Sequence, residues 1–176
     1  MKFFKIINCF FNRISSEIQK ISYKKLGIFS AIFLAIGIIS WIVGGRTDRI
    51  SILYIFPRSA LPITYAFIFW AFFFVILGGI IAGIIFGCEK YRRNRAFKIG
   101  FLLLITYICT LCVYPLFFRA LMPLVSFFML LLSILFCIFA LLESIKLYSL
   151  WSICIFLEML WLIYNAYVTL AFAFIN

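Results

Sequence analysis

Five long apolar runs constrain the fold of this chain more than any other feature. About 20 consecutive apolar residues let a helix cross the hydrocarbon core of a bilayer, and each run is about that long. The links between the runs are short, so consecutive helices should be antiparallel neighbours. The sequence therefore predicts an all-α integral membrane protein, a five-transmembrane-helix bundle with spans at Leu26–Gly44, Pro62–Gly87, Phe97–Phe118, Leu121–Leu142 and Tyr148–Phe174.

The composition excludes the other fold classes. Hydrophobic residues make up 68% of the 176 residues and charged residues 12%, whereas a soluble domain is about half apolar and a quarter charged. A soluble fold of this length has too little interior to hide so much apolar surface. A membrane β-barrel requires alternating apolar and polar residues, and these runs are apolar on every face. We expect one membrane domain over residues 26–176.

Positive charge is concentrated outside the apolar runs. The formal net charge is +11, but this is the pattern of loops that face anionic lipid, so the partner we expect is the bilayer and not nucleic acid. Twelve of the 16 Lys and Arg fall on the side of the N-terminal segment and four on the other. By the positive-inside rule, this predicts a cytoplasmic N-terminus. The expected location is a bacterial cell membrane.

Residues 1–25 form a separate basic segment. Apolar residues recur there at helical spacing with Lys and Arg between them. This pattern predicts an amphipathic helix lying on the inner membrane face. A basic leader that serves only as a topology signal is the alternative.

Groups that carry chemistry are scarce. The chain has no His, which excludes His-ligated metals and Ser-His or Cys-His catalysis, and we expect neither a metal nor a cofactor. Cys109 and Cys112 form a C-x-x-C pair in "YICTLCVYP". This motif resembles the core of the DsbB-type quinone-linked disulfide oxidases, which implies thiol-disulfide exchange as an alternative function. The pair lies deep in the third run and has no second cysteine pair to work with, so an enzyme is not the leading hypothesis.

Glu158 is the most unusual residue. It stands inside the fifth apolar run, where a charge costs at least ~2.5 kcal/mol. Trp161, Asn165 and Thr169 follow at i+3, i+7 and i+11 and give one polar-aromatic stripe on that helix. Two interpretations remain open: a ligand pocket, or hydrogen bonds that only fix helix packing.

Several motifs resemble the TspO/MBR family, the translocator-protein or peripheral benzodiazepine receptor group. The resemblance covers roughly residues 26–176. "PRSALP" precedes the second run, followed by Trp70, Phe74 and Gly78 at the family's intervals, and Phe117 and Phe118 match in the third run. The last run, "LEMLWLIYNAYVT", keeps Trp161 and Tyr167, and the chain closes on Asn176. The family's Pro-Tyr pair is replaced by Leu157 and Glu158, and its third-helix tryptophan is absent.

The resemblance implies a receptor or carrier that binds a planar apolar ligand, porphyrin-like or sterol-like, between the helices. The first loop would cap the cavity, and a homodimer is expected. Gly79-x-x-x-Gly83 fits either that dimer or packing within the chain. A structural accessory subunit of a membrane complex is a further alternative. Carried over by position, and with Glu158 added, the ligand-binding residues would be Pro62, Trp70, Phe74, Thr110, Tyr114, Glu158, Trp161 and Asn165.

Overall fold

The computed structural model describes residues 12, 15, 22–44, 55–87, 93–146 and 149–176. The regular secondary structure in these ranges is all helical. Five of these helices are long and apolar enough to cross a membrane, which confirms the predicted five-helix bundle. The amphipathic helix predicted for residues 1–25 lies almost wholly outside the described residues. The elements are α2 (Tyr23–Gly44), α4 (Ile63–Phe86), α5 (Arg93–Tyr114), the π-helical turn η2 (Pro115–Arg119), α6 (Pro123–Ile145) and α7 (Ser149–Ile175).

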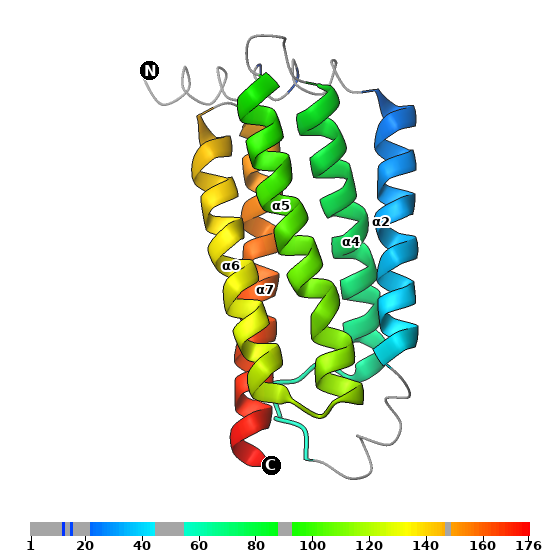
Figure 1. Cartoon of the computed structure of the whole chain (residues 1–176), viewed down its shortest axis with the longest axis vertical. Helices are drawn as coiled ribbons and strands as arrows, with labels where there is room; N and C mark the ends of the chain where they lie inside the picture. The colour runs from blue at the N-terminus through cyan, green and yellow to red at the C-terminus, as the bar shows by residue number, and fades with distance from the viewer. Residues whose placement is uncertain (1–11, 13–14, 16–21, 45–54, 88–92, 147–148) are drawn as a thin grey trace.

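Consecutive helices run in opposite directions along one axis (Figure 1). α2, α5 and α7 begin at the end where α4 and α6 finish, and the C-terminus lies at the opposite end. α6 packs between α5 and α7, whereas α2 packs mainly on α4. We call the first end the basic end, because the described cations Lys24, Lys25, Arg93, Arg95, Lys98 and Lys146 lie there. At that end Lys98 pairs with Glu143 at 2.6 Å.

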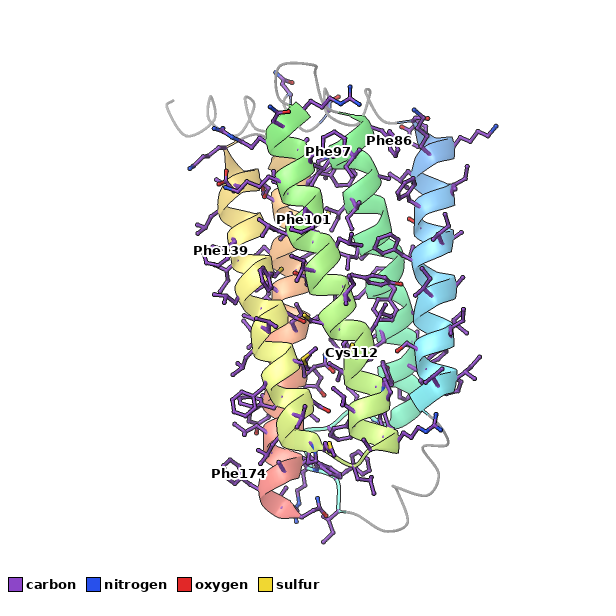
Figure 2. All side chains as sticks on the ribbon, viewed as in Figure 1. Phe86, Phe97, Phe101, Cys112, Phe139 and Phe174 are labelled. Carbon is purple, nitrogen blue, oxygen red and sulfur yellow. The ribbon has the colours of Figure 1, made fainter. Side chains whose placement is uncertain are left out.

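The usual arrangement of apolar interior and polar surface is inverted in α6. Its buried face is made of small and weakly polar residues together with one leucine: Ser126, Leu130, Ser133, Cys137, Ala140 and Ser144. Large apolar side chains point outward instead, as Phe139 on α6 and Phe97 and Phe101 on α5 show (Figure 2). Lipid solvates large apolar groups as well as a protein core does, so small residues face neighbouring helices to allow close approach.

Glycines on α4 are used for packing within the chain. A Cβ on Gly78 would lie 2.8 Å from the carbonyl oxygen of Phe29, so α2 and α4 touch there through their backbones. A Cβ on Gly83 would overlap the ring of Trp151 on α7. Gly79 faces Ser30 and Leu26 of α2. The small-residue face of α4 is therefore occupied by α2 and α7 of the same chain.

Pro115 reshapes the end of α5. Proline has no N–H, so the carbonyl of Leu111 four residues earlier lacks its usual helical donor. The hydroxyl of Ser40 on α2 donates to that carbonyl at 2.6 Å, which ties α2 to α5. After Pro115 the chain widens into η2, where the Ala120 N–H donates to the Pro115 carbonyl at 3.0 Å. Leu121 then takes a positive φ of 52° to turn the chain into α6.

Candidate functional site

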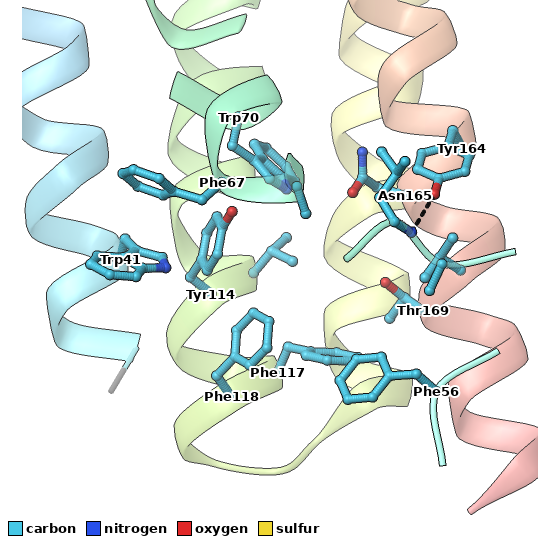
Figure 3. Close-up of a pocket in the computed structure, with 15 residues that line it drawn as sticks. Trp41, Phe56, Phe67, Trp70, Tyr114, Phe117, Phe118, Tyr164, Asn165 and Thr169 are labelled. Atoms are coloured by element: carbon cyan, nitrogen blue, oxygen red, sulfur yellow. Dashed lines mark hydrogen bonds between the residues drawn. The ribbon is translucent and has the colours of Figure 1, made fainter. Parts of the chain in front are cut away.

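An aromatic cavity lies at the end of the bundle opposite the basic end, between α2, α4, α5, η2 and α7 (Figure 3). Its volume is about 80 Å³. Most of its walls are aromatic or aliphatic, and a few polar groups stand among them. The lining residues are Trp41, Phe56, Ala60, Leu61, Ala66, Phe67, Trp70, Val113, Tyr114, Phe117, Phe118, Tyr164, Asn165, Val168 and Thr169.

The rings of the cavity pack on one another. Trp70 of α4 meets Tyr114 edge-on, with ring centroids 5.4 Å apart, and Tyr114 stacks on Phe118 at 5.6 Å. Trp41 of α2 meets Phe67 at 4.6 Å. The π-helical turn brings Phe118 and its neighbour Phe117 to the cavity in successive positions, and such turns are frequent at functional sites.

Residues 55–61 form a strap that lines one side of the cavity, and it is held by the side chains of Tyr164 on α7 and of Asn176, the residue after α7. The Tyr164 hydroxyl accepts from the Leu61 N–H at 3.1 Å and donates to the Ser59 carbonyl at 2.9 Å. The Asn176 amide accepts from the N–H of Ile55 and donates to its carbonyl, both at 2.9 Å. The side-chain amide of Asn176 thus makes the same pair of hydrogen bonds with Ile55 that the backbone of a neighbouring strand would make. Both ends of the strap are therefore held, one by Tyr164 of α7 and the other by Asn176.

Besides Tyr164, three polar side chains line the cavity. Asn165 donates from its amide nitrogen to the Trp161 carbonyl at 2.7 Å, and its side chain faces the space between α7 and Tyr114 (Figure 3). The hydroxyls of Tyr114 and Thr169 are the other two. An apolar chamber with a few fixed polar groups is the usual composition of a small-molecule site, where the polar groups set the orientation of the ligand.

The structure brings together some of the residues predicted from the sequence. Trp70, Tyr114 and Asn165 line the cavity. Phe74 lies beyond it, in a smaller space of about 10 Å³ that Trp70 and Tyr114 also border. Trp161 stands behind Trp70 with ring centroids 5.9 Å apart and stacks on the rings of Phe73 and Tyr164.

The other three predicted residues do not line the cavity. Pro62 directly precedes α4 and its carbonyl accepts from the Ala66 N–H. Thr110 is buried between α5 and α6, where its hydroxyl donates to the Thr106 carbonyl at 2.7 Å. Glu158 is 1% exposed and lies two helical turns before Asn165 on α7.

Several residues that line the cavity were not predicted from the sequence. Trp41 stands near the end of the first apolar run, and Tyr164 follows Trp161 by three residues. The available signal for Trp41 was an aromatic residue at the end of an apolar run, and for Tyr164 it was helical spacing from the predicted site residue Trp161. Ala60 and Leu61 belong to the "PRSALP" motif of the first loop, which the resemblance implied as the cap of the cavity, but no signal singled out these two residues or Phe56 as lining residues.

The two cysteines of the C-x-x-C motif lie on α5 as free thiols. Cys109 is buried close to Ser133 of α6. Cys112 is partly exposed, and neither residue lines the cavity. In the part of the chain that the structure describes, no group of three or more His, Cys, Asp or Glu residues is placed to hold a metal ion.

Comparison of the chain with protein-family models, curated proteins and solved structures finds no match. The resemblance to the TspO/MBR family therefore stays a prediction from its motifs.

Proposed function

We propose that this protein is a membrane receptor or carrier for a flat apolar molecule, bound in the aromatic cavity. The observation that carries the proposal is the cavity itself, whose walls include Trp41, Trp70, Tyr114 and Phe118. Aromatic faces stack on planar ligands and contribute large contact areas. A porphyrin-like or sterol-like ligand, which the motif resemblance implies, belongs to this class.

The size of the cavity makes the strap part of binding. Sites for drug-sized ligands measure roughly 300–1,000 Å³, several times the 80 Å³ of the cavity. A macrocycle therefore enters only when the strap moves away from α7. The side-chain hydrogen bonds of Tyr164 and Asn176 hold it there, and each such bond contributes about 0.5–1.5 kcal/mol.

The polar groups favour a ligand with a few oxygen or nitrogen atoms at its edge. The Asn165 amide and the Tyr114 hydroxyl are placed to orient it within the cavity. Exposed Arg58 on the strap and exposed Arg119 at the end of η2 lie at the same end of the bundle. Guanidinium groups pair with carboxylates, so a ligand that carries carboxylates at its rim, as porphyrins do, suits this end.

We further propose that the basic end faces the cytoplasm and the cavity faces the outside of the cell membrane. Six of the described Lys and Arg lie at the basic end, and two lie at the cavity end. The positive-inside rule assigns the richer end to the cytoplasm.

A binding titration with protoporphyrin tests the proposal in lipid nanodiscs. Ala66 lines the cavity, so Ala66→Leu should fill part of it and weaken saturable binding at least tenfold, which is about 1.4 kcal/mol. Ala35 on α2 is exposed to lipid, and Ala35→Leu is the matched control that should leave binding unchanged. Equal binding by the two variants would remove the cavity as the site.

Contact quenching by a brominated naphthalene locates the bound ligand. Trp70 lines the cavity, whereas Trp151 is buried near the basic end against Gly83. A variant that keeps only Trp70 should show saturable quenching, and a variant that keeps only Trp151 should not. Quenching of Trp151 alone would place the ligand elsewhere in the bundle.

A further inference from the structure

The centre of the bundle holds a second polar site, separate from the cavity, between α5, α6 and α7. The Ser133 hydroxyl of α6 lies 3.3 Å from both the Thr110 hydroxyl and the Thr106 carbonyl of α5. The Thr106 hydroxyl lies 3.1 Å from the Leu102 carbonyl and 3.4 Å from the Ser133 carbonyl. Thr106, Thr110 and Ser133 are each no more than 1% exposed, so this hydroxyl cluster is enclosed.

Glu158 contributes a buried carboxyl group to the same interior. It is 1% exposed, and its Oε2 has no hydrogen-bond partner. Across the interface, its carboxyl group interacts electrostatically with the thiol of Cys137 on α6. Cys137 lies one helical turn from Ser133 on the buried face of α6, so the carboxyl is at about the depth of the hydroxyl cluster.

Three of the neighbouring donors are already committed to backbone carbonyls, whereas the indole N–H of Trp161, three residues after Glu158 on α7, is buried without a hydrogen-bond partner. Thr110 donates to the Thr106 carbonyl at 2.7 Å. The Thr106 hydroxyl is in reach of two carbonyls, and the Cys137 thiol donates to the Ile155 carbonyl at 3.6 Å. A carboxylate needs donors, and these groups have none left to give it. Their oxygen and sulfur lone pairs remain able to accept, which is what a protonated carboxylic acid requires.

Charged side chains are also missing at this depth among the described residues. The facing ionisable groups are the Cys109 thiol of α5, the Cys137 thiol of α6 and the Cys154 thiol of α7 itself, while Tyr107 of α5 donates to the Phe33 carbonyl of α2. The described sequence of α4 contains no Lys, Arg, Asp or Glu. The Lys98–Glu143 pair lies at the basic end. Among the described residues, an ionised Glu158 would therefore stand in the membrane with no counter-charge and no hydrogen bond to its Oε2, at high cost.

We propose that Glu158 is a proton-binding site at the centre of the bundle, a neutral carboxylic acid at pH 7 whose proton exchanges with water. Keeping an unsatisfied polar atom buried is unfavourable, and a packing residue of similar volume would avoid this cost. An intramembrane acid kept in such a place is the mark of a proton site. The inference does not depend on the aromatic cavity, because it is drawn from different residues.

Infrared spectroscopy of the full chain in lipid vesicles tests the site directly. A protonated carboxylic acid has a carbonyl band separate from those of carboxylates and amides. The native protein at pH 7 should show this band, and Glu158→Gln should lose it. Glu143→Gln is the matched control, because Glu143 pairs with Lys98 at the surface; it should keep the band. Transfer to deuterium oxide should shift the band in the native protein.

Each outcome decides the proposal. A band that is present in the native protein and in Glu143→Gln, absent in Glu158→Gln and shifted by deuterium supports an exchanging proton site. No band in the folded native protein, or the same band in Glu158→Gln, overturns it. A Glu158 band that stays unshifted after prolonged exchange also overturns it, because the acid would then be sealed.

Discussion

Replacing Ser40 by alanine should destabilise the bundle by about 1–2 kcal/mol, more than any other serine-to-alanine change on α2. The Ser40 hydroxyl donates to the Leu111 carbonyl at 2.6 Å. Pro115 lies four residues after Leu111 and has no N–H, so Ser40 takes the place of the missing helical donor. Without the hydroxyl, the carbonyl is left without its donor in an apolar interior, where each unsatisfied group is costly.

Ser30 is the matched control on the same helix. Its hydroxyl donates to the Val75 carbonyl of α4 at 2.9 Å, but Gly79, four residues after Val75, has a backbone N–H that serves this carbonyl within the helix. Ser30→Ala should therefore cost only about 0.5 kcal/mol, near the average for hydrogen bonds between membrane helices.

A double-mutant cycle isolates the role of the proline. In a Pro115→Ala background, the restored N–H at position 115 gives the Leu111 carbonyl a second donor, so Ser40→Ala should cost about 1 kcal/mol less than in the native chain. Reversible unfolding in mixed micelles, followed by helical circular dichroism, measures each free energy. The reasoning is refuted if Ser40→Ala costs no more than Ser30→Ala, or if its cost is unchanged in the Pro115→Ala background.

Three further predictions follow from single contacts. Gly78→Ala should destabilise by about 1–3 kcal/mol, because its Cβ would lie 2.8 Å from the Phe29 carbonyl oxygen; Gly27→Ala, whose Cβ meets nothing within 4 Å, should be neutral or stabilising in the same unfolding assay. Glu158→Leu should raise stability by about 1 kcal/mol, because it removes an unsatisfied buried oxygen; a lower thermal midpoint would contradict this. Tyr164→Phe should speed hydrogen exchange in residues 55–61 several-fold, because the strap loses its hydroxyl partner. Exposed Tyr167→Phe should leave that exchange unchanged.

Part of the candidate site was predictable from the sequence. Trp70, Tyr114 and Asn165 were placed in a pocket by motif spacing, and all three line the cavity. The same spacing put Thr110 with them, and the polar-aromatic stripe of the last run added Glu158, but these two residues lie between α5, α6 and α7 instead. Spacing gives the face of a helix on which a residue lies and its depth, and it does not give the neighbouring helix which that face meets.

The bundle as a class was determined by the sequence alone. Apolar runs of membrane length leave a backbone no solution except internal hydrogen bonding in helices, so the number of spans and their alternating direction follow from the runs and their short links. The arrangement of those helices around one another came only from the tertiary structure. Every face of such a run is apolar, so hydropathy does not separate lipid-facing from buried residues. Which face of each helix is buried is decided by the close packing of small residues against neighbouring helices, as Gly78 against α2 and Ser133 against α5 show.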